Sequence, residues 1–285
     1  MNYKLEKNKI TIFDTSDFNI EHILECGQVF RYKKLENCYE VYSLNHKATI
    51  FSQKVVTICC DDEKYFEKYF DLERDYAKIK VALKKDSLIG NSIDFGYGIR
   101  ILNQSKLEAI ISFIISANNN IPRIKQIIEN ICTNYGEYVA EQNFYAFPTF
   151  DKLCNIPLEF FTKIKCGYRD KYLYNTIQML KNVDLKEWET LSSEKLKQEL
   201  LKLYGVGSKV ADCIMLYGFH RSDVFPTDTW IKKVYVDFCA GDDKATEKKV
   251  RSYFVNRYKE LSGYAQQYLF YNKRSSKWEK EKLHY

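Results

Sequence analysis

The first quarter of the chain alternates short apolar runs with polar turns. The runs at 29–32, 39–42, 48–51 and 55–58 are rich in β-branched and aromatic residues, which are the residues that strands prefer. Because the connections between them are short and polar, we expect an antiparallel meander between about residues 10 and 60.

From residue 61 the apolar residues recur every three to four positions. Tyr65, Phe66, Tyr69 and Phe70 lie on one stripe, as on the buried face of a helix. A run of strands followed by a run of helices predicts an α+β fold.

The helical pattern is strongest after residue 105. One helix has its apolar face at 107–114 and ends at Asn118, and Pro122 suits the first turn of a second helix with isoleucines at 124–131. The basic segment 273–277 is expected to be a solvated end. Further helices are predicted at 151–156, 158–165, 169–181 and 186–191.

These patterns divide the chain into three predicted domains. Residues 1–104 form an N-terminal antiparallel β-sheet domain with helices. Residues 105–192 form a helical domain, and residues 193–285 form a helical domain that contains a helix-hairpin-helix motif.

The hairpin is predicted by two helical patterns that meet at Gly205-Val206-Gly207. The two glycines permit close approach of the backbone. The free N–H groups of the turn lie at a helix N-terminus, where an anion such as a DNA phosphate is favoured. Ser208 is the expected N-cap, which places Lys209 in the first turn.

Lys209 and Asp228 are the candidate catalytic pair. The helix dipole and burial both disfavour an ammonium, so Lys209 is a candidate for a neutral, nucleophilic amine; the alternative is an ordinary solvated lysine. Asp228 precedes an apolar helical pattern, so it is either a simple N-cap or a carboxylate that stabilises positive charge on a sugar.

Composition limits the other possibilities. The net charge of +6 and the pI of about 8.6 suit a polyanionic partner. No apolar run reaches the roughly 20 residues that span a bilayer, and no secretory signal is recognised, so we expect a soluble, cytoplasmic protein with no membrane partner. The nine cysteines have no metal-ligand spacing and are expected to be reduced thiols.

Five ordered motifs resemble those of 8-oxoguanine DNA glycosylases of the helix-hairpin-helix superfamily. The hairpin differs mildly from the family pattern, because Tyr204 replaces the usual proline. The motifs are CGQVFRY (26–32), ISFIISANNNIPRI (111–124), GYRDKYL (167–173), LYGVGSKVADC with VFPTDTW (203–213 and 224–230), and GYAQQYLF (263–270).

The resemblance implies catalytic and base-binding roles for particular residues. Lys209 would attack the anomeric carbon and form a Schiff base, and Asp228 would stabilise the transition state. The Gly27 carbonyl would accept a hydrogen bond from the ring N–H that 8-oxoguanine has and guanine lacks. Three further side chains would contact the flipped base: Cys213, Gln266 and Phe270.

The resemblance also implies how DNA is held. Tyr168 would act as a wedge in the gap left by the flipped base, and Asn118, Arg123 and Arg169 would donate to the estranged cytosine. The turn at 205–207 would bind a phosphate of the DNA backbone. Together these residues predict that the partner is double-stranded DNA containing oxidised guanine, preferably opposite cytosine. The enzyme is expected to be a monomer.

The number of cysteines after Asp228 distinguishes branches of the superfamily that differ in their cofactor. The branches with an iron–sulfur cluster carry four cysteines after the catalytic region, whereas only Cys239 follows Asp228 here. We therefore expect no iron–sulfur cluster, no catalytic metal and, at most, a structural alkali ion in the hairpin turn. The alternatives are a glycosylase for another damaged base, or a helix-hairpin-helix protein that binds DNA without catalysis.

Overall fold

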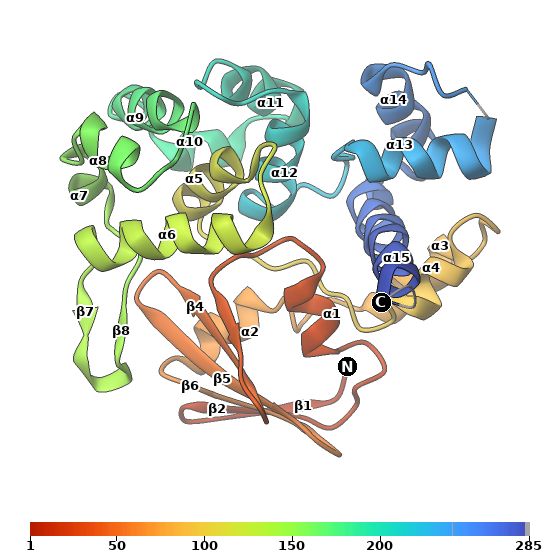
Figure 1. Cartoon of the computed structure of the whole chain (residues 1–285). Coiled ribbons are helices and arrows are strands. Elements are labelled where there is room, and N and C mark those ends of the chain that lie inside the picture. The colour runs from red at the N-terminus through yellow and green to blue at the C-terminus, as the bar shows by residue number, and fades with distance from the viewer. Residues whose placement is uncertain (241, 283–285) are drawn as a thin grey trace.

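The computed structural model describes residues 1–240 and 242–282. An N-terminal β-sheet lies beneath two groups of helices (Figure 1), which confirms the α+β prediction. The strands are β1 (Tyr3–Glu6), β2 (Lys9–Ile12), β3 (Tyr32–Lys34), β4 (Tyr39–Ser43), β5 (His46–Ser52), β6 (Val56–Cys60), β7 (Tyr138–Val139) and β8 (Phe144–Tyr145).

The helices occupy most of the chain after residue 60. The α-helices are α1 (Ile20–Glu25), α2 (Glu63–Tyr69), α3 (Tyr76–Leu83), α4 (Gly90–Phe95), α5 (Lys106–Ser116), α6 (Ile121–Tyr135), α7 (Phe150–Cys154), α8 (Leu158–Lys163), α9 (Arg169–Leu180), α10 (Leu185–Thr190), α11 (Ser193–Leu201), α12 (Ser208–Gly218), α13 (Thr229–Tyr235), α14 (Glu247–Tyr258) and α15 (Ser262–Lys282). Three short elements complete the chain: the 3-10 helices η1 (Ala140–Gln142) and η3 (Lys259–Leu261), and the π-helix η2 (Val236–Ala240).

The main sheet has the order β1-β2-β6-β5-β4-β3, with every neighbouring pair antiparallel. The predicted strands at 39–42, 48–51 and 55–58 are present as β4, β5 and β6. The bounds of the strand predicted at 29–32 were wrong, because only Tyr32 of this range belongs to β3. Val29 and Phe30 are buried ahead of the strand, and Arg31 donates from Nη2 to the Tyr145 carbonyl at 2.7 Å.

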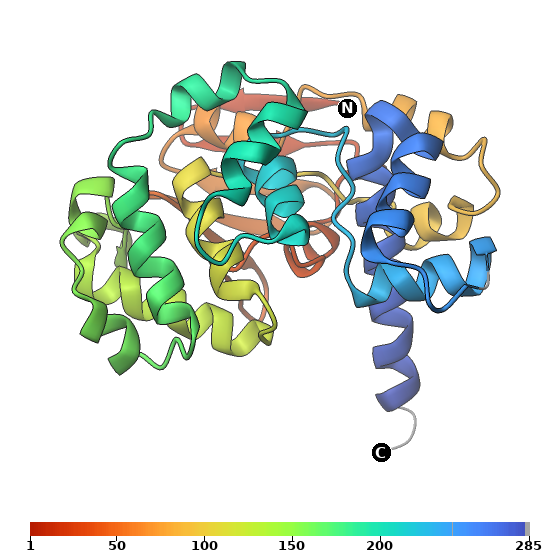
Figure 2. The ribbon, with the colours of Figure 1, turned by 90° about the horizontal axis from the view of Figure 1, so that it is seen from above.

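Two hydrophobic cores are present. One core lies between the sheet and the helices α1 and α2. The other is built mainly by residues of the helices from α3 through α15. In both views α3 and α4 lie beside α15, although they belong to the predicted first domain (Figures 1 and 2). Helix α4 of the predicted first domain therefore packs against a helix of the predicted third domain.

The helices form two groups on top of the sheet. The hairpin helices α11 and α12 lie with α5 to α10, and α13, α14 and α15 form the other group (Figures 1 and 2). The segment 273–277, predicted as a solvated end, continues α15, which extends to Lys282, and Lys273, Arg274 and Ser275 within it are partly exposed. Among the described residues, no helix combines the length and apolar character needed to cross a bilayer.

Asp212 links these two groups of helices. It is completely buried in α12 and accepts from Lys197 Nζ of α11 at 2.8 Å and from Arg251 Nε of α14 at 2.6 Å. Because a buried charge is tolerated only when it is paired, this carboxylate holds the hairpin against α14.

Asp212→Asn should lower the free energy of unfolding by about 3 kcal/mol, because it leaves two largely buried cations without their anion. Urea denaturation would measure the change. The matched control is Asp242→Asn, which breaks an exposed pair with Lys249 and should have no measurable effect. Equal stabilities for the two variants would contradict the role assigned to Asp212.

Candidate active site

The hairpin turn is shaped by its two glycines. Gly205 has a φ of +76°, and a Cβ there would lie 2.7 Å from the Tyr172 ring, so only glycine fits. Val206 is buried, whereas no atom lies within 4 Å of a Cβ placed on Gly207. The turn therefore packs against α9 on one side and is open on the other, as an anion grip requires.

The predicted N-cap at Ser208 was one residue late. Gly207 is the N-cap of α12 and Ser208 is its first residue. The Ser208 hydroxyl instead accepts from Lys197 Nζ at 3.0 Å. The first N–H groups of α12 have no side-chain cap, which leaves them available for an external acceptor such as a phosphate.

Lys209 and Asp228 line the same cavity, which has a volume of about 1040 Å³. Lys209 lies in the first turn of α12, as predicted, and its side chain is half-buried. Phe270 of α15 and Trp230 of α13 line the same cavity. Residues far apart in sequence thus meet between the two groups of helices.

Asp228 serves as an N-cap and also faces the cavity. Its Oδ1 accepts from the Ile231 N–H at 2.9 Å at the start of α13. Burial raises the pKa of Asp228, although the bond from Ile231 and the charge of Lys209 oppose that rise. The two readings of this aspartate are therefore compatible, since one oxygen is enough for the cap.

The expectation that Lys209 is a neutral amine was wrong for the free protein. Burial acts to lower the pKa of Lys209, but Cys213 and Asp228 outweigh burial, and the pKa of Lys209 is raised overall. Cys213 lies one turn further along α12, and burial raises the pKa of its thiol to about 11. The lysine is therefore an ammonium at neutral pH and must lose a proton before it can act as a nucleophile.

Gly27 lies in a turn whose neighbours are tightly held. Its φ is +85°, a conformation that favours glycine. The Cys26 carbonyl accepts from Gln267 Nε2 at 2.9 Å, and the Gln28 carbonyl accepts from Gln104 Nε2 at 2.7 Å. Among the described residues no donor bonds to the Gly27 carbonyl, so this acceptor is available between two occupied ones.

Of the predicted base-binding side chains, Phe270 lies against this turn. A Cβ on Gly27 would lie 3.3 Å from Phe270 Cε1. Gln266 precedes Phe270 by one turn of α15 and is buried, and its Oε1 has no hydrogen-bond partner in the described part of the chain. An unpaired buried acceptor is costly, so this oxygen is suited to receive an N–H from a ligand.

Tyr168 and Asn118 lie at the predicted DNA face. Tyr168 is 52% exposed, which is unusual for a tyrosine and appropriate for a wedge. Asn118 is exposed with a left-handed φ of +48°, and it directly follows the C-cap of α5 at Ala117. The loop thus presents the asparagine amide outward at the end of a buried helix.

The two arginines of this face differ. Arg123 is exposed and donates from Nη2 to the Lys165 carbonyl at 2.7 Å. Arg169 is 3% exposed and donates to the Ala117 carbonyl at 2.8 Å and to the Asn118 carbonyl at 2.6 Å. In the free protein Arg169 therefore holds the Asn118 loop, and contact with a cytosine would require it to exchange these bonds.

Comparison with known proteins identifies the family. Residues 10–110 match the family model of the 8-oxoguanine DNA glycosylase N-terminal domain, and residues 111–260 match that of HhH-GPD superfamily base excision DNA repair proteins. A Clostridium acetobutylicum 8-oxoguanine glycosylase/lyase, solved with double-stranded DNA containing cytosine opposite 8-oxoG, is 37% identical; the match covers 97% of this chain and 99% of that chain, with a TM-score of 0.92. The chain belongs to the 8-oxoguanine DNA glycosylase family.

Two curated relatives agree with this assignment. The Arabidopsis thaliana N-glycosylase/DNA lyase OGG1 is 34% identical over 203 residues, which is 66% of this chain and 55% of that protein. The chain thus spans little more than half of that relative's length. The Saccharomyces cerevisiae N-glycosylase/DNA lyase is 28% identical over 273 residues, which is 82% of this chain and 71% of that protein.

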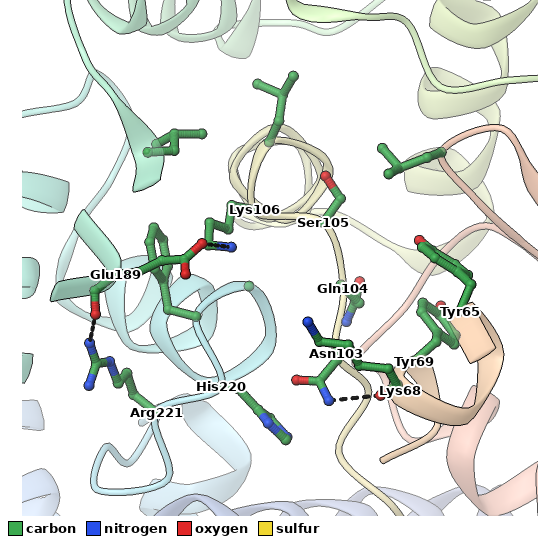
Figure 3. Close-up of a pocket in the computed structure, with 15 residues that line it drawn as sticks. Tyr65, Lys68, Tyr69, Asn103, Gln104, Ser105, Lys106, Glu189, His220 and Arg221 are labelled. Carbon is green, nitrogen blue, oxygen red and sulfur yellow. Dashed lines mark hydrogen bonds and ion pairs between the residues drawn. The ribbon is translucent and has the colours of Figure 1, made fainter. Parts of the chain in front are cut away.

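A second pocket lies at the C-terminal end of α12, whereas Lys209 lies in the first turn of that helix (Figure 3). Lys106 there pairs with Glu189, and Arg221 donates to the Glu189 carbonyl. None of the predicted site residues lines this pocket. Within the described residues, no group of three or more histidine, cysteine, aspartate or glutamate side chains is placed to hold a metal ion.

Arg274 is a charged residue of the cavity that the sequence patterns did not identify. It lines the cavity with Lys209 and Asp228, and its guanidinium carbon lies 5.1 Å from the centre of the Phe270 ring. The signal was present, because Gln266, Phe270 and Arg274 are spaced by four and such residues share a helix face. The basic composition of the segment concealed it.

The coupling between Lys209 and Asp228 is testable. Asp228→Asn removes a negative charge beside the amine, so the pKa of Lys209 should fall and the amine should lose its proton at lower pH. NMR titration of isotope-labelled lysine side chains would measure the midpoint. Glu247→Gln is the control, because the charge of Glu247 raises the pKa of Lys209 less. An unchanged midpoint in Asp228→Asn would contradict the coupling.

Proposed function

We propose that this protein is a bifunctional DNA repair enzyme that flips 8-oxoguanine out of duplex DNA, excises it and cleaves the resulting abasic strand. The observation that carries this proposal is the cavity shared by Lys209, Asp228 and Phe270. It combines a nucleophile, a carboxylate and an aromatic surface beside the free carbonyl of Gly27. Homology to 8-oxoguanine glycosylase/lyases supports the same reaction.

The lysine supplies the covalent chemistry. As the bond to the base breaks, the base leaves with the electron pair and takes the proton that Lys209 Nζ gives up, and the neutral amine forms a bond to the anomeric carbon. The bond from that carbon to the ring oxygen then breaks, the ring oxygen takes a proton from the attached nitrogen, and a Schiff base remains. Loss of a C2′ proton and departure of the 3′ phosphate complete β-elimination.

Asp228 supplies charge stabilisation. Positive charge develops on the sugar as the base departs, and a carboxylate fixed in advance by its bond to Ile231 stabilises that charge without reorganising. The same fixed carboxylate keeps Lys209 protonated in the free enzyme. Positive charge on the sugar would weaken its hold on that proton, so the amine would be freed when it is needed.

The Gly27 carbonyl would distinguish 8-oxoguanine from guanine. It would accept the ring N–H of 8-oxoguanine, whereas guanine presents a lone pair at that position. Leaving a buried acceptor opposite a lone pair costs about 1–3 kcal/mol or more. The unpaired Oε1 of Gln266 would accept a second N–H, and Phe270 would stack on the base.

The remaining parts of the proposal concern the contacts to DNA, the cofactors and the place in the cell. Asn118 and Arg123 would donate to the estranged cytosine while Tyr168 fills the gap. Lysine and aspartate together supply the chemistry, so the proposal needs no catalytic metal or iron–sulfur cluster; an alkali ion could join the carbonyls of 205–207 to a phosphate. Acting as a monomer on genomic DNA, the enzyme would work in the cytoplasm at the nucleoid.

Borohydride trapping tests the mechanism. Wild-type protein should form a covalent adduct with duplex DNA that contains 8-oxoguanine, and Lys209→Gln should reduce trapping by at least about 1000-fold, because the nucleophile is lost. Gel electrophoresis measures the adduct. Lys195→Gln, which changes an exposed lysine of α11, is the control. An adduct that survives Lys209→Gln would refute the assigned nucleophile.

The preference for cytosine is the second test. Wild-type enzyme should excise 8-oxoguanine faster opposite cytosine than opposite adenine, and Arg123→Ala should reduce that preference by about tenfold, since one base contact is worth about 1–3 kcal/mol. Lys163→Ala is the control: this neighbouring exposed lysine should affect both substrates equally and reduce the salt dependence of binding. Equal wild-type rates opposite both bases would contradict the prediction.

A further inference from the structure

A cation lies inside the predicted base pocket. Arg274 is half-buried on α15 and lines the cavity that contains Lys209 and Asp228. Its Nη1 lies 2.8 Å from the position of a Cβ on Gly27, which is the turn whose carbonyl is free. A neutral base could be recognised by neutral groups alone, so the cation needs a separate explanation.

The guanidinium is held by two interactions in the free protein. Its Nη2 donates to the Glu25 carbonyl at the end of α1, where the helix dipole favours positive charge. The same group lies over the ring of Phe270 at 5.1 Å from its centre, within the range of a cation–π interaction. Nη1 lies toward Gly27, and among the described residues no acceptor is bonded to it.

We propose that Arg274 is a base-binding residue that donates from Nη1 to a carbonyl oxygen of the flipped base. The inference rests on the proposed function. A base that places its N–H on the Gly27 carbonyl brings the exocyclic carbonyl oxygens nearest to that N–H to the same edge of the pocket. The guanidinium shifts from the face of Phe270 to that edge when the base stacks.

The contact strengthens as the reaction proceeds. When the bond between the sugar and the base breaks, both electrons of that bond pass to the base, and negative charge spreads onto its carbonyl oxygens. A guanidinium hydrogen-bonded to one of them stabilises the departing anion more than the neutral base. Arg274 thus complements Asp228, because one faces the charge on the base and the other faces the charge on the sugar.

The prediction separates base excision from strand cleavage. Arg274→Met retains the apolar stem but removes the charge, and it should slow single-turnover excision of 8-oxoguanine at saturating enzyme by about 10- to 100-fold, the value of a charged hydrogen bond. Cleavage of DNA with a preformed abasic site should remain within about twofold, because no base is present. Arg274→Lys, which restores the charge, should recover part of the excision rate.

The control is Lys273→Met. It removes one positive charge from the adjacent residue, whose Nζ pairs with Asp237 at 2.5 Å and which does not line the cavity. Excision by this variant should match the wild type.

Three outcomes would overturn the inference. Excision by Arg274→Met at the wild-type rate or faster would show that Arg274 does not assist the reaction. An equal loss of excision and abasic-site cleavage would show a structural role. A rate for Arg274→Lys no higher than that for Arg274→Met would exclude the charge as the cause. If wild-type protein does not excise 8-oxoguanine at all, the proposed function fails instead.

Discussion

A single buried carboxylate fixes the relation between the two groups of helices. Asp212 receives a lysine from the hairpin group and an arginine from the C-terminal group, and it lies less than one turn after Lys209 in the same helix. The cavity that contains Lys209 and Asp228 lies between these groups, which the ion cluster holds together. The attraction is strong because the carboxylate is excluded from water, and both cations share Oδ1, since Arg251 binds the two carboxylate oxygens and Lys197 binds Oδ1.

The surroundings of Lys209 and Cys213 favour the protonated form of both side chains in the free protein. The Asp228 carboxylate favours the ammonium form of Lys209, and burial keeps the Cys213 thiol protonated. A neutral amine free in the pocket could react with any aldehyde in the cell. An ammonium does not react with an aldehyde, so the Asp228 carboxylate keeps the amine of the free protein unreactive.

The elements with regular apolar spacing were predictable from sequence, and the isolated contacts were not. The pattern at 107–114 correctly predicts α5, and Asp228 was correctly placed at the start of a helix. The N-cap of α12 was missed by one residue because Ser208 has the right chemistry but bonds to Lys197 of another helix. The direction of the shift in the pKa of Lys209 depends on side chains that no local pattern brings together.

Charge composition can hide a residue that lines a cavity. A basic segment near a terminus is normally solvated, yet the segment at 273–277 continues a helix whose preceding turns are buried. The position of Arg274 at the cavity is therefore set by the helix and not by the preference of its own side chain for water. Likewise Arg169, which sequence alone places toward DNA, is occupied by backbone carbonyls of a neighbouring loop.

Adjacent residues of α15 have different tasks at the Gly27 turn. Gln267 holds the Cys26 carbonyl, and it also accepts a bond from the Tyr217 hydroxyl of α12, while the Oε1 of Gln266 has no hydrogen-bond partner among the described residues. A change in the helix that repositioned Gln266 would also disturb the hydrogen-bonded link between α12 and the N-terminal turn. Phe270 makes none of these hydrogen bonds, so its side chain can be exchanged without breaking that link.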